Sequence, residues 1–262
     1  MAKQNFKLII ILVILFVIPH ILIAIGSLLD PFSPNPDFRY QKPSSEHPFG
    51  TDYLGRDLFA RTIYAAGLSI KTSMMALLIG GLFSFIFGSL AGFFYNKLPD
   101  KIISWISSIF ITVPTILILS AVLSVFKPGL EITYLIVGLL LWPLPARLVK
   151  GEIIQIKNST FILAERALGI PKHLTILKSI PLVFYPALAN LLFILPELIT
   201  LEVGLSLLGF GVQPPIPSLG KLILQGVIEA NLAWWEALFP IFILVIIMII
   251  TFILTKNLKI RY

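Results

Sequence analysis

Cysteine is absent from this 262-residue chain, and charged residues make up only 13% of it. The lack of cysteine excludes a disulfide framework, a thiol nucleophile and a thiolate metal site, and it leaves the redox compartment open. A GxSxG nucleophile elbow is also missing. The sequence has no GxxxxGK(S/T) phosphate-binding loop either, so if the protein acts together with ATP, another chain must bind the ATP. With 57% hydrophobic residues and a mean hydropathy of +0.96, the composition excludes a soluble globular protein.

Long apolar runs dominate what is present, and an apolar run of about 20 residues can cross a bilayer as a helix. We predict an all-α integral membrane fold with six transmembrane helices, at residues 8–29, 72–94, 102–126, 132–147, 182–208 and 237–255. The first run can alternatively be read as a signal peptide, because Ala24-Ile25-Gly26 faintly resembles a cleavage site. A signal core spans only about 7–15 residues, so an uncleaved first helix is favoured.

The positive charge of the chain is concentrated in the segments that this topology places inside the cell. The net charge is +7, and 13 of the 20 Lys and Arg residues fall in those segments when Arg147, at the inner end of the fourth span, is counted with them. Cytoplasmic loops of membrane proteins carry such an excess, so we expect both termini in the cytoplasm. No basic patch with interleaved stacking aromatics is present, which argues against a nucleic-acid partner.

A polar stretch, residues 30–61, separates the first two apolar runs. It is rich in proline at first, which indicates an irregular external loop. Further on, Asp52 or Asp57 can begin a helix. Its apolar side would lie along the membrane surface and comprise Leu54, Leu58 and Ile63. A metal site from His47, Asp52 and Asp57 is conceivable, but helix caps and turn contacts are favoured and no metal-binding residue is predicted.

Glycines and prolines mark special points along the apolar runs. Gly80, Ser84, Gly88 and Gly92 recur every four residues and leave a smooth stripe for close helix–helix packing. Prolines predict bends or breaks because they lack a backbone N–H. Within the predicted spans, such bends or breaks are expected at Pro114, Pro143, Pro145, Pro186 and Pro196. Residues 219–230, after a second loop rich in glycine and proline, are predicted to form an interfacial or re-entrant helix.

Few ionisable groups fall inside the predicted spans. Glu197 and Glu202 lie five residues apart, so they do not share one helical face and a paired-carboxylate site is not predicted. An ionisable group in hydrocarbon usually faces a bundle interior or a wet cavity. We therefore expect Glu202 to be an intramembrane polar residue with a structural or gating role, and His20 to be a hydrogen-bonded packing residue.

The longest polar interval in the second half of the chain is residues 148–181, which is predominantly basic and is predicted to be cytoplasmic. Within it, residues 160–168 predict a short helix, with Thr160 as its cap and Gly169 and Pro171 ending it. The expected apolar side comprises Ile162, Leu163, Ala167 and Leu168, while Glu165 and Arg166 point elsewhere. Such a helix must be covered, either by its own membrane ends or by a groove on a partner protein.

Four strings in this chain resemble the permease subunits of the dipeptide, oligopeptide and nickel class of ABC importers. ILAERALG, at residues 162–169, resembles the "EAA" loop of that family, with Leu163 at its glutamate and Glu165 at its second alanine. HPFGTDYLGRDLFAR at residues 47–61, WPLPARLVKG at residues 142–151 and EVGLSLLGFGVQPPIPSLG at residues 202–220 are similar to three further motifs of the family. Leu219 stands where the last of these motifs has tryptophan.

The resemblance implies a division of labour in a bacterial cytoplasmic (inner) membrane. Residues 1–68 would be an anchor helix, external loop and interfacial helix, and residues 69–262 the permease transmembrane domain. The implied partners are a second homologous permease, two ATP-binding cassette subunits, an external solute-binding protein and membrane lipid. This chain would bind no cofactor and contribute no catalytic residue, since ATP and Mg would be used by the partner ATPases.

The resemblance also assigns residues to two contact regions. The loop that couples to the ATPases would comprise Leu163, Ala164, Glu165, Arg166, Ala167, Leu168 and Gly169. The external gate or binding-protein contact would comprise Gly50, Asp52, Gly55, Arg56, Asp57, Gly209, Gly211, Pro214 and Pro215. The solute can be a dipeptide, an oligopeptide, nickel or a nickel–metallophore complex, and no polar cluster on the spans selects among them.

Two other classes of function remain as alternatives. A self-sufficient secondary carrier or channel, with Glu202 or His20 relaying protons, would be expected to show internal repeats and a midplane cluster of ionisable groups. The sequence shows neither. A membrane-embedded enzyme lacks a nucleophile motif and a His/Asp/Glu ligand cluster.

Overall fold

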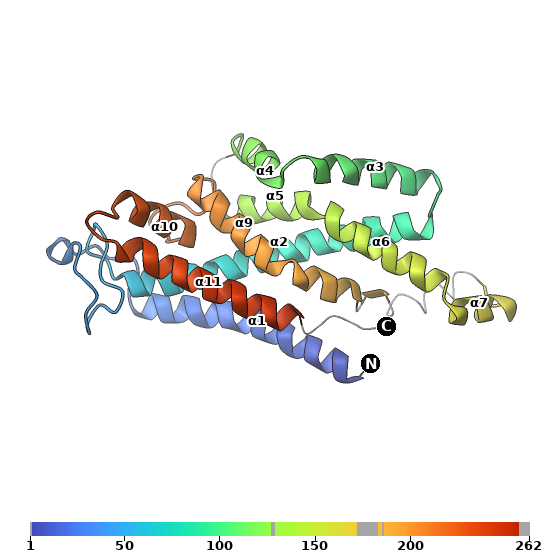
Figure 1. Cartoon of the computed structure of the whole chain (residues 1–262), viewed down its shortest axis with the longest axis horizontal. Helices are drawn as coiled ribbons and strands as arrows, with labels where there is room; N and C mark the ends of the chain where they lie inside the picture. The colour runs from blue at the N-terminus through green and yellow to red at the C-terminus, as the bar shows by residue number, and fades with distance from the viewer. Residues whose placement is uncertain (1, 127–128, 172–182, 185, 257–262) are drawn as a thin grey trace.

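The computed structural model of the chain is an elongated bundle of helices that run roughly along its long axis (Figure 1). It describes residues 2–126, 129–171, 183–184 and 186–256. Within these ranges no β-strand occurs, and one isolated bridge joins Thr51 to Asp57. The predicted all-α class is confirmed for this part of the chain.

Two long helices cover the first third of the chain. α1 spans Ala2–Leu28 and α2 spans Leu58–Phe93 without a break. The expectation of a separate surface helix before the second span is wrong, because residues 58–71 form the first turns of α2. Asp57 caps this helix, as one of the two predicted cap positions, with its side chain accepting from the Ala60 backbone N–H at 2.7 Å.

The next two predicted spans are bent, each at a proline. α3 (Leu98–Thr112) and α4 (Thr115–Leu123) meet at 89° around Pro114. α5 (Leu130–Leu141) and α6 (Pro143–Lys157) meet at 41° beside Pro143. Both bends were predicted, whereas the continuation of α6 for ten residues beyond Arg147 was not.

The last third contains the remaining helices. α7 spans Thr160–Ala167, residues 186–193 are helical, and α9 spans Leu195–Leu207 with Pro196 in its first turn. α10 (Leu219–Ile228) is the predicted short apolar helix, and α11 (Trp235–Lys256) is the last long one. Four helices of the described chain are long and apolar enough to cross a membrane, or up to six if each bent pair counts once. The count of six spans therefore stays a prediction.

The predicted smooth stripe on α2 is the contact surface for α5 and α6. A Cβ atom at Gly80 would lie 2.9 Å from the Gly138 carbonyl oxygen, and one at Gly88 would lie 2.6 Å from the Ala146 carbonyl oxygen. Between them, the Ser84 hydroxyl donates to the Trp142 carbonyl at 2.9 Å, at the bend between α5 and α6. Absence of side chains lets the backbones approach, and α2 becomes the centre of the bundle.

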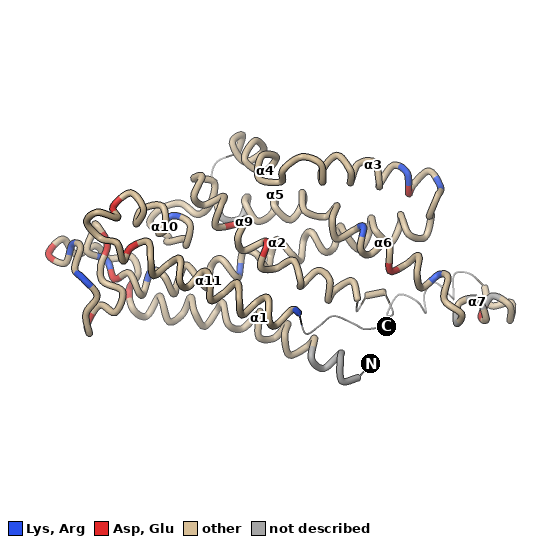
Figure 2. Tube along the Cα trace, in the orientation of Figure 1, with Lys and Arg blue, Asp and Glu red and all other residues tan. Residues whose placement is uncertain are grey.

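The two ends of the bundle differ. At the loop end, residues 29–57 lie beside α10 and the start of α11, whereas α7 projects from the opposite end, called here the α7 end (Figure 1). Figure 2 shows both signs of charge at both ends of the bundle. Alongside Asp100 and Glu152, the α7 end carries several lysines. These include Lys97, Lys101, Lys150 and Lys157.

Candidate functional site

The loop end is organised around one buried carboxylate, that of Asp52, which is 2% exposed. Its Oδ1 accepts from the backbone N–H groups of Leu54 at 2.9 Å and Arg56 at 3.0 Å. Its Oδ2 lies 2.8 Å from Arg56 Nε and 3.4 Å from Arg61 Nε. Because both guanidinium groups are also buried, these charges stabilise one another out of water.

Arg61 extends this arrangement to the end of α1. Its Nη1 donates to the Pro31 carbonyl at 2.7 Å. The side chain thus joins the first turn of α2, the 50s turn and the segment that follows α1. We call Asp52, Arg56 and Arg61 the charged cluster.

The same turn is fixed to α11 by a second set of contacts. Trp235 Nε1 donates to the Thr51 carbonyl at 3.2 Å, and the Phe49 and Phe239 rings stack with centroids 4.2 Å apart. Gly50 has a φ of +75°, and a Cβ atom there would lie 2.7 Å from Trp235 Nε1. Only glycine satisfies both that backbone conformation and that close approach.

His47, Asp52 and Asp57 do not form one ligand set. His47 Nδ1 lies 2.7 Å from Asp57 Oδ2, while Asp52 is taken up by arginines. Among the residues that the structure describes, no group of three His, Cys, Asp or Glu side chains is placed to hold a metal ion. The favoured interpretation as helix caps and turn contacts fits these distances.

The second predicted loop, after α9, lies against the charged cluster. A cavity of about 100 Å³ is lined by residues from the 50s turn, this loop, α10 and α11. The predicted gate residues that line it are Asp52, Arg56, Pro214 and Pro215. Gly50, Gly55, Asp57, Gly209 and Gly211 do not line it; Gly50, Gly55 and Gly209 have positive φ angles at turns, and Asp57 caps α2.

Sequence reasoning missed five polar residues of this cavity as site residues, namely Tyr53, Arg61, Lys221, Gln225 and Glu236. Arg61 belongs to the 47–61 motif and could have been found there. Glu236 is 2% exposed, and its Oε1 has no hydrogen-bond partner among the described residues. Lys221 donates to Gln213 Oε1 at 3.0 Å, and burial lowers the pKa of Lys221 below its ordinary value.

Glu202 and His20, the two candidate proton relays, lie apart in the chain and in different surroundings. Glu202 Oε1 accepts from the Ser206 hydroxyl at 3.0 Å, and the residue lines a cavity of about 20 Å³ with Ser73 and Thr133. That volume has room for about one water molecule. His20 is exposed, and its Nδ1 lies 2.8 Å from the Phe16 carbonyl oxygen of the preceding turn.

At the α7 end, the predicted short helix is present, but its buried side differs from the prediction. Ile162 and Glu165 are buried at 4% and 6% exposure, whereas Leu168 is 80% exposed. The expectation that Glu165 points away from the covered side and Leu168 toward it is therefore wrong. Residues three apart share a helical face, and the fold buries the face with Ile162 and Glu165.

The bounds of α7 agree closely with those predicted from the sequence. Thr160 is the first helical residue instead of the cap before it. Gly169 has a φ of +76°, and the Ile170 N–H donates to the Glu165 carbonyl at 3.1 Å, which closes the helix. Ala164, Ala167 and Gly169 are exposed. The side chains of Leu163 and Arg166, and residues 172–182, lie outside the described part of the structure.

Comparison with known proteins gives one family match and several relatives. Residues 84–262 match the family of binding-protein-dependent transport system inner membrane components. The chain is 32% identical over 223 residues to the dipeptide transport system permease protein DppC of Alkalihalophilus pseudofirmus, covering 82% of this chain and 71% of that protein. It is 33% identical to DppC of Bacillus subtilis over 204 residues, and 33% identical to the oligopeptide transport system permease protein OppC of the same organism over 199 residues.

The coverage of the two Bacillus subtilis relatives is less complete. Each alignment covers 76% of this chain, but only 63% of that DppC and 65% of that OppC. The chain thus spans somewhat less than two thirds of the length of these two proteins.

Proposed function

This chain belongs to the family of binding-protein-dependent transport system inner-membrane components, and on that premise we propose that it is one permease subunit of an ATP-driven peptide importer. Its multiple apolar helices fit a multi-pass protein of the inner membrane. The proposed complex contains a second permease, two ATPase subunits and an external solute-binding protein. Peptides are preferred over nickel or metallophores as the solute, because the relatives are named for dipeptides and oligopeptides.

The observation that carries the proposal is the position and surface of α7. It projects from one end of the bundle, follows α6 directly and exposes Leu168. An exposed apolar side chain on a short projecting helix favours docking in a groove on another protein. The lysines around this end favour the cytoplasmic side of the membrane, where the ATPases would lie.

A movement of α7 would be transmitted to the bundle through the contacts of α6 with α2 and α3. α6 packs along α2 over the glycine stripe, and Lys157 Nζ donates to the Phe93 carbonyl at the end of α2 at 3.2 Å. Lys150 is paired with Asp100 of α3 and donates to Ser104 at 3.0 Å. Since these helices are tied to α6, a push on α7 would move them together as one body.

At the loop end, the charged cluster and the cavity beside it are proposed as the contact for the binding protein or the outer gate. Both predicted loops contribute to this cavity. A rearrangement of either loop would therefore change the cavity, which is what an outer gate requires.

Co-expression with candidate ATPase subunits tests the proposal. A Leu168→Asp variant should lose complex formation and peptide-dependent ATP turnover, because a charge replaces the apolar contact. Leu232→Asp is the matched control, since Leu232 is 66% exposed at the loop end. It should retain assembly with the ATPases. Equal assembly of both variants would contradict docking through α7.

The same preparation discriminates the rival class. A secondary carrier or channel would move the solute as a single purified chain in liposomes, without ATPase partners. Transport of that kind would overturn the proposal, whereas a strict requirement for both ATPases and ATP supports it.

A further inference from the structure

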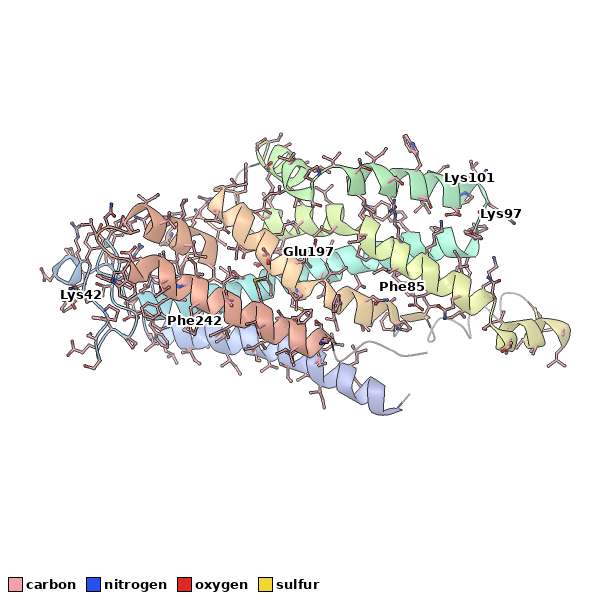
Figure 3. All side chains as sticks on the ribbon, viewed as in Figure 1. Lys42, Phe85, Lys97, Lys101, Glu197 and Phe242 are labelled. Carbon is pink, nitrogen blue, oxygen red and sulfur yellow. The ribbon has the colours of Figure 1, made fainter. Side chains whose placement is uncertain are left out.

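The exposed face of α9 is polar, unlike those of the other long helices. Across Leu195–Leu207, every residue of which the structure describes, the exposed side chains are those of Glu197 and Thr200. Three residues apart, they lie on one face of the helix. Figure 3 shows Glu197 on α9 in the middle of the bundle.

The neighbouring helix α11 has the exposed surface that is expected of a helix facing lipid. Its exposed residues before the terminal Lys256 are all apolar, and Val245, near the middle of the helix, is 47% exposed. The exposed residues in the middle of α2 are also aliphatic, including Leu78, Leu82 and Ile86. α9 differs from both, since it has no exposed apolar residue between Leu195 and Leu207.

The depth of Glu197 makes this difference decisive. It lies 11 residues into the apolar stretch Pro186–Leu207, which corresponds to about 16 Å of helix. That is close to the middle of a hydrocarbon layer about 30 Å thick. A carboxylate at that depth is tolerated where it faces a wet cavity or the interior of a bundle, and not where it faces lipid.

The other carboxylate of α9 does not share this face. Glu202 is turned into the bundle, where Ser206 donates to it. The Thr200 hydroxyl donates to the Pro196 carbonyl at 2.9 Å, so it remains satisfied on the exposed side. Glu197 is thus the ionisable group that α9 presents outward at mid-depth.

We propose that the Glu197–Thr200 face of α9 lines a water-filled solute path, and that the Glu197 carboxylate binds the cationic amino end of the transported peptide. The ligand part rests on the proposed function; the wet face does not. A carboxylate in a narrow water-filled path with low-dielectric walls attracts a cation more strongly than it would in open solution, because the walls focus its field. An ammonium group is the cation that every peptide with a free N-terminus carries.

Cysteine accessibility tests the wet face, because the chain has no cysteine of its own. Thr200→Cys and Glu197→Cys would be compared with Val245→Cys in the assembled transporter in membranes, with accessible partner cysteines replaced. A charged, membrane-impermeant methanethiosulfonate reagent should modify the two α9 positions at least tenfold faster than position 245. Modification rates that agree within twofold at all three positions would overturn the proposal. That result would mean that the Glu197–Thr200 face is covered, either by lipid or by the second permease.

Uptake of a dipeptide and of its N-acetylated form tests the ligand. Glu197→Gln should lower uptake of the free dipeptide at least tenfold and abolish its advantage over the acetylated one, while Thr200→Val retains that advantage. An unchanged preference in Glu197→Gln would refute the ammonium contact. If the unsubstituted transporter takes up neither peptide, the proposed function fails, and the accessibility result still decides whether the face is wet.

Discussion

At the scale of single residues, buried charged side chains hold the 50s turn at the loop end in its conformation. Asp52, Arg56 and Arg61 are all less than 10% exposed. The Nε atoms of both arginines lie within 3.4 Å of the same oxygen, Asp52 Oδ2. A buried ion pair adds little to the free energy of unfolding compared with apolar side chains of similar size. Removing one partner, however, leaves the other as an uncompensated buried charge. The cluster therefore fixes the conformation of the 50s turn more than it adds to net stability.

Asp52→Asn should destabilise the protein by about 3–5 kcal/mol, because two buried guanidinium groups lose their counter-charge. Thermal unfolding in detergent measures this as a lower midpoint. Asp37→Asn is the control, since Asp37 is exposed in a short 3₁₀ helix and should change the midpoint little. Equal midpoints for the two variants would contradict a structural role for the cluster.

At the scale of elements, the packing of α2 on α5 and α6 depends on missing side chains. Gly80, Gly88 and Gly92 each meet a neighbouring helix at a distance that leaves no space for a Cβ atom. By contrast, Gly151 of α6 has no atom within 4 Å of where a Cβ would lie. The two kinds of glycine should respond in opposite ways to the same substitution.

Gly88→Ala should cost about 1–3 kcal/mol by overpacking, because the new methyl group would lie 2.6 Å from the Ala146 carbonyl oxygen. Gly151→Ala should be neutral or stabilise the helix by up to about 1 kcal/mol. Unfolding midpoints in the same detergent compare them. A loss of stability in Gly151→Ala as large as that in Gly88→Ala would refute the close-packing argument.

The start of α2 offers a second element-scale prediction. Asp57→Ala should lower stability by about 0.5–2 kcal/mol, since the side chain caps the helix at the Ala60 N–H. Asp57→Asn keeps an acceptor at that position and should retain most of the stability. If both variants lose the same amount, the contact between Asp57 and His47 outweighs the cap.

At the scale of the whole molecule, the distribution of charge favours one orientation in the membrane. Lys97 and Lys101 lie toward the α7 end (Figure 3). Lys150 and Lys157 belong to α6, the helix that leads into α7. The loop end combines acidic and basic residues, many of them paired with each other. By the positive-inside rule, the α7 end is expected in the cytoplasm.

Single cysteines in intact cells test this orientation. Ser45→Cys, exposed in the loop between α1 and α2, should react with an impermeant thiol reagent added outside. Leu168→Cys lies at a position that is 80% exposed in this chain. In cells that lack the partner ATPases, which would otherwise cover it, it should react only after the cells are opened. The reverse pattern would place α7 outside and remove the basis of the coupling proposal.

Much of the local structure could be predicted because it depends on neighbours in sequence. Proline lacks a backbone N–H, which indicated the breaks at Pro114 and Pro143. Pro19 and Pro240, by contrast, lie inside α1 and α11, which continue past them. Repeated glycines at four-residue spacing predicted the packing stripe of α2, and Gly169 predicted the end of α7. The early start of α2 at Leu58 was missed for two reasons. Asp52 was as good a predicted helix start as Asp57, and Leu54, Leu58 and Ile63 fitted the apolar side of a surface helix.

The candidate site could be predicted only in part. The motif at residues 47–61 indicated Asp52 and Arg56, yet nothing local showed that Glu236, far along the chain, would line the same cavity. Nor could helical spacing decide which side of α7 would be covered. Glu165 lies three residues from both Ile162 and Leu168, so spacing alone does not separate a covered face from an exposed one.

The sequence by itself determined that this chain is built of apolar helices, that two of them bend at Pro114 and Pro143, and that α2 can pack closely against its neighbours. These properties follow from chain length, apolar content and backbone chemistry, which act over a few residues. Only the tertiary structure decided which faces are covered: Glu165 inward, Leu168 outward, Asp52 between two arginines, and Glu197 exposed on α9. Those outcomes depend on contacts between segments that are distant in the chain, because burial is a property of the packed bundle and not of any one helix.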